Sequence, residues 1–316
     1  MRDPSLGLFA LDSPFGRPLH QLWLELAVLA CTLLVFGHAL RAYRAGDRRP
    51  MFQWLVLTSY GVQMELIAFN FLHNYEHARF TVQLVEGQLP LYVTGFYGTV
   101  MYAGIKVAER LGAHPIVECF VAGLAMCLID VPFDIAGAAL GWWRWLDTDP
   151  NIAFRWLGVP VTSYYWYLIF GAVATGLCRL LWSRLSKRPF ALAALVALPA
   201  GFAVVFFGVL GFLPFHAIHA LGIEEGTIVA AHIVVVAAVA LALRGERKPM
   251  ERWIAIAALL LPTTCAILLV AEASHVEAPL VRLAWSWAAL AGLAAMSFAL
   301  PLRAAAPLST LAAATR

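Results

Sequence analysis

Residues 115–138 read PIVECFVAGLAMCLIDVPFDIAGA, and this run indicates the fold class. It is long enough to cross the hydrocarbon core of a bilayer, which takes about 20 mostly apolar residues in a helix. Near its end it contains two aspartates, Asp130 and Asp134, which are four positions apart and therefore share one helical face. A charge inside a membrane span costs at least about 2.5–3.5 kcal/mol. The pair therefore needs a functional or structural reason.

The rest of the chain has the same apolar character. Of its 316 residues, 62% are hydrophobic and 13% are charged, whereas a soluble domain has about 45–50% apolar and roughly 25% charged residues. This composition excludes a water-soluble globule and a disordered chain. The net charge of +3 is spread along the chain without a basic block, which argues against nucleic-acid binding. The composition therefore predicts a polytopic membrane protein.

The apolar runs predict an all-α integral-membrane helix bundle with nine spans. Eight is the alternative count, because the third and seventh runs are short and the stretch 213–227 is ambiguous. Residues 1–20 are expected to form an extramembrane segment and residues 303–316 a disordered tail. Between them lies the bundle, residues 21–302, whose site-bearing part is about 52–240. The predicted spans are 21–40, 52–72, 91–108, 115–138, 160–182, 190–213, 227–243, 253–272 and 282–302.

Basic residues indicate the orientation of these spans, because cytoplasmic loops carry an excess of lysine and arginine. With the N-terminus outside, all but six of the 22 lysines and arginines fall on the inner side. We therefore predict an N-outside, C-inside topology in a bacterial cytoplasmic membrane. The six residues on the outer side are Arg2, Arg17, Arg79, Arg144, Arg155 and Arg282.

Acidic residues collect toward the predicted outer, non-cytoplasmic side. Glu65 lies in the outer half of the second span, and Asp130 and Asp134 lie in the outer half of the fourth. Intramembrane carboxylates that face one cavity indicate a functional site, so these three are candidate catalytic residues. The alternative is that they only join helices by pairing with arginines or hydroxyls. The other polar residues expected to bind the substrate are Asn70, Asp147 and Asp149, of which Asp149 also fits a turn or cap.

The connection between the fourth and fifth spans is rich in aromatic residues. Residues 142–167 contain eight tryptophans and tyrosines, which is more than one crossing of an interfacial aromatic belt needs. Aromatic faces beside carboxylates suit a reaction that passes through a carbocation, because π-faces stabilise positive charge. A simple aromatic belt is the alternative. The residues expected to line the substrate cavity are Trp142, Trp143, Trp145, Tyr164, Tyr165 and Trp166.

Histidines offer a metal-binding alternative. His73 and His77 are four positions apart, and His216 and His219 are three apart. Each pair would share a helical face, as a zinc or iron site requires, and His232 with an aspartate would complete the site. The sequence from His73 to His77 is not HExxH, however, and paired histidines also occur as solvated or packing residues. We therefore favour no cofactor, with a divalent metal such as zinc or iron as the alternative.

The segment around the two aspartates resembles a known family. The motifs that carry the resemblance are Leu128-Ile-Asp-Val-Pro-Phe-Asp134, Gly141-Trp-Trp-Arg-Trp145 and Gly158-Val-Pro160. They are similar to elements of the membrane carotenoid-biosynthesis family that includes bisanhydrobacterioruberin-type hydratases, and Glu65 matches a glutamate in an earlier helix of that family. The segment also resembles uncharacterised multispan proteins with a W-x-D-T-D-P-N signature. The likeness covers about residues 60–175. The Thr-Gly-x-Pro-Phe-Gly-x-Tyr segment that follows this glutamate in the hydratases is missing here, so the resemblance implies a shared scaffold.

Three functions compete on this sequence. The favoured one is a hydratase-, lyase- or isomerase-like enzyme that does acid–base chemistry through a cation on an isoprenoid- or carotenoid-like lipid in an outer-leaflet cavity. Hydration, isomerisation and cyclisation all fit that description. The second is a metal-dependent intramembrane lipid hydrolase or oxidoreductase. The third is a non-enzymatic lipid- or pigment-binding protein or a transporter. The expected partners are the bilayer and a hydrophobic lipid.

Overall fold

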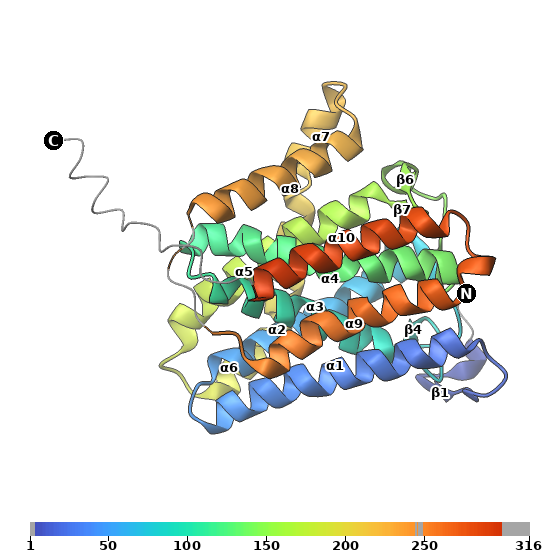
Figure 1. Cartoon of the computed structure of the whole chain (residues 1–316). Helices are drawn as coiled ribbons and strands as arrows, with labels where there is room; N and C mark the ends of the chain where they lie inside the picture. Colours follow the sequence, from blue (N-terminus) through green and yellow to red (C-terminus); the bar gives the residue numbers. More distant parts are fainter. Residues whose placement is uncertain (1–3, 244, 246–248, 299–316) are drawn as a thin grey trace.

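The computed structural model describes residues 4–243, 245 and 249–298. Within this range the chain forms a bundle of long helices that run roughly side by side (Figure 1). The predicted tail, residues 303–316, lies outside the described residues. The helices are α1 (Leu19–Arg44), α2 (Arg49–Ile67), α3 (Leu91–Arg110), α4 (Pro115–Leu140), α5 (Val161–Leu185), α6 (Phe190–Leu210), α7 (Leu213–Ala220), α8 (Glu225–Ala242), α9 (Arg252–Ala271) and α10 (Pro279–Phe298).

Eight helical segments of the described chain are long and apolar enough to cross a membrane. The predicted all-α polytopic membrane bundle is therefore confirmed. Two of these segments combine elements, because α2 continues into a π-helical turn, η2 (Ala68–Leu72), and α6 continues into the short α7. The other long helix, α3, carries Lys106 and Glu109 near its end and packs against α1, α2, α4 and α9. The ambiguous stretch 213–227 thus corresponds to α7 and the start of α8.

Helix α4 lies at the centre of the bundle and packs against α3, α5, α8, α9 and α10. Its glycines allow the close approach of neighbouring helices, as small residues do in membrane bundles. A Cβ atom at Gly123 would lie 2.1 Å from the carbonyl oxygen of Leu168 on α5, and one at Gly171 would lie 2.7 Å from the Cα atom of Gly123. Because α4 is held this tightly, the aspartates near its end have defined positions.

Short β-strands lie together at one end of the bundle, which we call the strand end (Figure 1). The all-helical prediction did not anticipate them. The pairing of β2 with β5 joins two connections far apart in the sequence and sets His77 opposite Trp143. The strands are β1 (Phe9–Leu11), β2 (Tyr75–His77), β3 (Val82–Leu84), β4 (Leu89–Pro90), β5 (Trp143–Trp145), β6 (Arg155–Trp156) and β7 (Val159–Pro160), and the pairs are β1–β3, β3–β4, β2–β5 and β6–β7.

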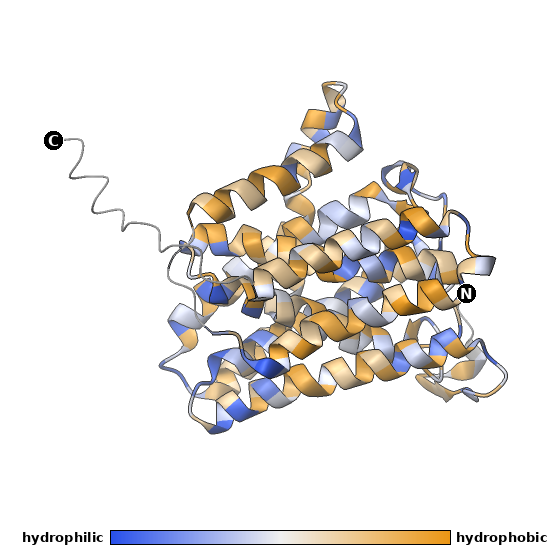
Figure 2. Cartoon of the chain, viewed as in Figure 1, coloured by the Kyte–Doolittle hydropathy of each residue, from blue (hydrophilic) through white to orange (hydrophobic). Residues whose placement is uncertain are grey.

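The surface of the bundle matches a lipid environment. Hydrophobic residues dominate the outward faces of the helices, and hydrophilic residues gather at the ends of the helices and in the connections (Figure 2). Helix α1 begins at the strand end, and α10 ends at the opposite end (Figure 1). The eight candidate spans match the alternative count, and a ninth crossing by α3 stays a prediction. Which end faces the cytoplasm stays a prediction.

A network of charged side chains lies at the end of the bundle opposite the strands. Oε1 of Glu109 accepts hydrogen bonds from Nη2 of Arg49 at 2.6 Å and from Nε2 of Gln53 at 3.0 Å. Its other carboxylate oxygen accepts one from Nζ of Lys106 at 2.8 Å. These ion-paired side chains are largely buried, so Glu109 neutralises two cations that are mostly removed from water.

We expect Glu109→Gln to lower the free energy of unfolding by about 2–3 kcal/mol, because Arg49 and Lys106 would remain partly buried without their counter-charge. Unfolding of the purified protein by sodium dodecyl sulfate in mixed micelles measures the change. The matched control is Glu224→Gln, at an exposed position before α8, which should change stability by less than about 0.5 kcal/mol. Equal stability of the two variants would contradict a stabilising role for this network.

Candidate functional site

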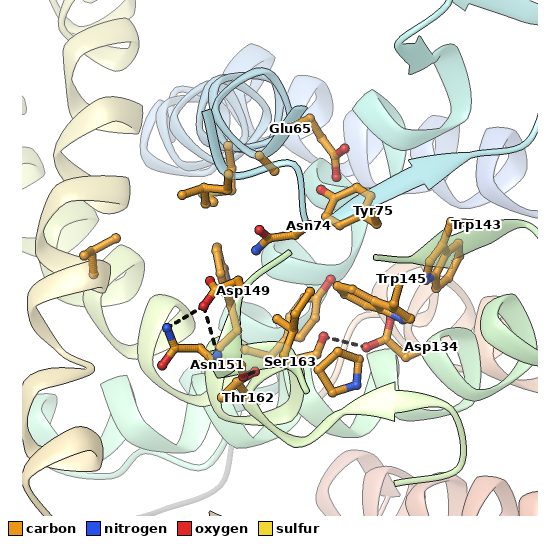
Figure 3. A pocket seen from close by; sticks show the side chains of 18 of the residues that line it. Glu65, Asn74, Tyr75, Asp134, Trp143, Trp145, Asp149, Asn151, Thr162 and Ser163 are labelled. Atoms are coloured by element: carbon orange, nitrogen blue, oxygen red, sulfur yellow. Dashed lines mark hydrogen bonds between the residues drawn. The ribbon is translucent and has the colours of Figure 1, made fainter. Parts of the chain in front are cut away.

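A cavity of about 340 Å³ lies at the strand end. The helices α2 to α5, the strands β2 and β5 and the junction of α6 with α7 all contribute to its walls, together with the 3-10 turn η3 (Pro150–Ile152). Most lining side chains are apolar or aromatic, and a few polar groups converge on the interior (Figure 3). A mostly apolar cavity with a few convergent polar groups is typical of a ligand-binding site.

One wall of the cavity carries Glu65, which is buried at the end of α2. Its Oε1 accepts a hydrogen bond from the hydroxyl of Tyr97 at 2.8 Å, and its Oε2 lies 3.2 Å from Nε2 of His77. Nδ1 of His77 is buried, and no described residue makes a hydrogen bond with it. Burial, together with the nearby Glu65 carboxylate, raises the pKa of Tyr75 well above its ordinary value. Glu65 and His77 therefore form a buried carboxylate–imidazole pair.

A different wall carries Asp134 of α4 (Figure 3). The hydroxyl of Ser163 on α5 donates a hydrogen bond of 2.7 Å to Oδ2 of Asp134. Asp130 lies one helical turn earlier, fully buried and close to Asp134 and Tyr167. No described residue makes a hydrogen bond of normal geometry with the Asp130 carboxylate. The predicted catalytic residues Glu65 and Asp134 thus meet at one cavity, and Asp130 lies directly behind Asp134.

Three of the six predicted aromatic lining residues, Trp143, Trp145 and Trp166, do line the cavity. The ring of Trp143 lies 4.9 Å from Phe133 and 6.2 Å from His77, measured between ring centroids. Trp145 packs edge-on against Tyr75 at 5.2 Å. These rings therefore line the same cavity as the two carboxyl groups.

The other three predicted aromatic residues lie outside the cavity lining. Trp142 is fully buried and donates a hydrogen bond from Nε1 to Nδ1 of His20 at 2.9 Å, so it ties the start of α1 to the end of α4. Tyr164 packs edge-on against Trp156, and the ring of Tyr165 packs against α7. Tyr164 and Tyr165 differ in direction from Trp166 because side chains project around α5, whereas Trp142 lies between the end of α4 and β5.

Of the predicted polar binding residues, only Asp149 lines the cavity. It also caps η3, because its Oδ1 accepts hydrogen bonds from the backbone nitrogen and Nδ2 of Asn151, so the cap role and the lining role coincide. Asn70 instead donates to the carbonyl oxygen of Leu66 at 2.8 Å. Asp147 is exposed and pairs with Arg155 at 2.6 Å. Asn70 and Asp147 therefore lie outside the cavity lining.

Only one of the two predicted histidine pairs lies on one helix. His73 follows the last turn of η2 with a positive φ, and His77 lies in β2, so these two do not share a helical face. His216 and His219 do lie together on α7, but His216 lines the cavity while His219 Nδ1 lies 3.0 Å from the carbonyl oxygen of Ile223. His232 packs edge-on against the ring of Tyr165. Among the described residues, no three His, Cys, Asp or Glu side chains are grouped to hold a metal ion.

Several lining residues escaped the sequence interpretation. Tyr97 and Ser163 lie near the beginnings of their predicted spans, at the same depth in the membrane as Glu65 and Asp134. This shared depth is the sequence signal that could have identified them. Asn74 is buried in the cavity wall, and no described residue makes a hydrogen bond with its Oδ1. Nothing in the local sequence distinguishes it from an ordinary loop residue. The β2–β5 pairing that orients His77 is equally invisible without the tertiary structure.

Comparison with known proteins identifies the family of this chain but does not indicate an activity. The family model described as Domain of unknown function (DUF7802) matches residues 20–273. The chain belongs to this family. The match spans α1 to α9 and so includes every residue of the cavity lining. No curated protein and no solved structure matches the chain significantly.

Proposed function

We propose that this DUF7802 protein is an integral-membrane enzyme that does acid–base chemistry on an isoprenoid-like lipid in the strand-end cavity. The observation that carries the proposal is the placement of Glu65 and Asp134 on different walls of one apolar, aromatic cavity. Acid–base chemistry needs a proton donor and a proton acceptor on either side of the reacting group. The apolar lining selects a hydrophobic substrate.

The Asp130–Asp134 pair is assigned the role of the acid. Two carboxyl groups one helical turn apart in an apolar environment do not both ionise readily, because like charges repel and burial disfavours the charged form. The pair would therefore keep a proton. Asp134 lines the cavity, so its carboxyl would transfer that proton to one carbon of a substrate double bond, leaving a carbocation at the other carbon.

The aromatic rings and the Glu65–His77 pair would complete the reaction. The faces of Trp143 and Trp145 would stabilise the cation without reacting with it. Water would then add to the cation and lose a proton to Glu65 or His77, giving an alcohol. Alternatively, the cation itself would lose a neighbouring proton to the same base, giving an isomer, and in either case solvent would return a proton to the acid.

The resemblance of this segment to membrane carotenoid-biosynthesis proteins supports the choice of an isoprenoid as the substrate class. It covers Asp130, Asp134, Trp143 and Trp145, and Glu65 is matched separately. The favoured side of the membrane is the non-cytoplasmic one, because the lysines and arginines concentrate in the connections at the other end.

Deuterium incorporation tests the proposal directly. Purified protein in proteoliposomes is incubated in D₂O buffer with lycopene or with a polyprenol, and the lipids are analysed by mass spectrometry after return to H₂O. Protonation of an alkene leaves deuterium bound to carbon, and such deuterium does not wash out. We expect a labelled product from the native protein and at least about a hundredfold less from Glu65→Gln. Glu224→Gln should match the native protein.

The same experiment has two contrary outcomes. If lipid copurifies with the protein but neither probe gains deuterium, the protein binds lipid without this chemistry, and the enzymatic proposal is wrong. If Glu65→Gln forms the labelled product at the native rate, the Glu65–His77 pair is not the base. A thermal-unfolding profile of each variant in detergent shows whether a lost signal reflects lost folding.

A further inference from the structure

The strand-end cavity reaches the lipid-facing surface of the bundle. Three of its lining residues, Leu72, Val209 and Leu213, are also exposed, to 40%, 55% and 61% respectively. Leu72 ends the candidate membrane span Arg49–Leu72, and the other two lie in the span Phe190–Ala220. Apolar side chains exposed on helices long and apolar enough to cross a membrane are suited to contact with lipid. We call the part of the cavity rim formed by these three residues the lateral opening.

The course of α6 explains why an opening exists there. Around its middle α6 packs closely on α2, where Gly201 lies against Ser59 and Tyr60 and where Nε2 of Gln63 donates to the carbonyl oxygen of Leu198 at 2.9 Å. Farther along, α6 packs on α5 instead. The close contacts of α6 thus pass from α2 to α5 toward the strand end.

The glycines of α6 mark this second contact. Gly208 lies against the ring of Phe170, and Gly211 lies against Ile169, both on α5. On the other side of the lateral opening, α2 ends in the π-helical turn Ala68–Leu72. Such π-helical turns occur frequently at functional sites. The lateral opening is thus formed by two regular features of the fold rather than by a loop.

The size of the cavity limits what can occupy it. About 340 Å³ is near the lower end of the roughly 300–1,000 Å³ that pockets for drug-sized ligands span. A long polyisoprenoid therefore does not fit inside as a whole. Only one end of it can lie between Glu65 and Asp134, while the rest of the chain needs an apolar environment outside the cavity. The lateral opening leads to such an environment.

We propose that the cavity takes its ligand from the bilayer through the lateral opening. The ligand class is a long-chain polyisoprenoid, which keeps most of its chain among the lipids and inserts one end between the two carboxyl groups. This inference uses the cavity of the proposed function, but it concerns binding and not turnover. The competing route is the polar edge of the cavity near Asp149 and Asn151, where Asn151 is exposed.

Photo-crosslinking tests the route. The probe is a polyprenol that carries a diazirine next to its hydroxyl group, incorporated into proteoliposomes that contain the full-length protein. After illumination, peptide mass spectrometry should find the label on the segments 65–77 and 143–151. The double variant Val209→Trp/Leu213→Trp narrows the lateral opening, and we expect it to reduce this labelling by about tenfold. The matched control is Leu195→Trp, which lies on α6 like Val209 and is exposed and outside the cavity lining, and it should label like the native protein.

Two further variants test the lateral route if Val209→Trp/Leu213→Trp fails to fold. Val209→Ala/Leu213→Ala widens the opening and should label at least as strongly as the native protein. Native labelling in the folded tryptophan pair, or loss of labelling in Asn151→Trp alone, would overturn the lateral route. Reduced labelling in the alanine pair would overturn it as well.

Labelling is also measured in Asp134→Asn, where turnover should fall by about a hundredfold or more. Cavity labelling without any deuterated product in the native protein would defeat the proposed reaction and leave the lateral route standing. Product formation together with undiminished labelling of the tryptophan pair would defeat the route alone.

Discussion

Asp134→Asn should lower the rate of deuterium incorporation into the lipid by about a hundredfold or more, which is the usual contribution of a general acid. Asparagine has nearly the shape of aspartate, and its side-chain oxygen can still accept the hydrogen bond that Ser163 donates at 2.7 Å. It has no acidic proton, so protonation of the substrate stops while the cavity keeps its shape. Initial rates in proteoliposomes, with thermal unfolding as a check on folding, measure the effect.

Two further variants make this result specific to the acid. Asp134→Glu retains a carboxyl group and should keep part of the rate. If Asp134→Asn lowered the rate only by disturbing the packing, Asp134→Glu would lower it at least as much. Glu224→Gln removes a carboxylate from an exposed position outside the cavity lining and should leave the rate unchanged. A rate in Asp134→Asn within about twofold of the native value would remove Asp134 from the mechanism.

Gly123→Ala should destabilise the bundle by about 2–3 kcal/mol or prevent its assembly, which is the upper range for overpacking a well-packed interior. The added Cβ atom would lie 2.1 Å from the carbonyl oxygen of Leu168. That neighbour is backbone, so α4 and α5 must separate to admit the methyl group. Because Asp134 is on α4 and Ser163 is on α5, the same separation should also reduce activity.

The matched control for this substitution is Gly37→Ala on α1. It also replaces a helical glycine by alanine, but nothing lies within 4 Å of the added atom. Alanine is more favourable than glycine in a helix by up to about 1 kcal/mol, so stability should stay equal or rise slightly. Unfolding in sodium dodecyl sulfate mixed micelles compares the two. Equal stability of Gly123→Ala and Gly37→Ala would contradict the close contact between α4 and α5.

The helical architecture was largely predictable because hydropathy is a local property. The run 115–138 corresponds to α4 within a few residues, and the run 91–108 corresponds to α3. The ambiguity at 213–227 had a physical cause, since α6 continues into the short α7 before the chain turns into α8. The strands at the strand end were missed because each has only two or three residues, too few to show an alternating pattern.

Some residues of the candidate site could be predicted from the sequence, but the contacts that these residues make could not. Glu65, Asp130 and Asp134 were found because a carboxyl group in a membrane span is costly and therefore informative. Adjacent tryptophans show the limit of that reasoning. Trp143 lines the cavity, while Trp142 points to His20. Composition treats these two residues alike, and only the packing of β5 beside β2 separates them.

By itself, the sequence determined that this protein is a helical membrane bundle and that its acidic and aromatic residues gather toward one end. Both conclusions depend on the hydropathy and the order of residues along the chain. The tertiary structure alone decided that His77 pairs with Glu65, that Ser163 pairs with Asp134, and that Leu72 lines the same cavity as both carboxyl groups. The reason is that these contacts depend on how α2, α4, α5 and α6 pack, and packing directions are set by side chains far apart in the sequence.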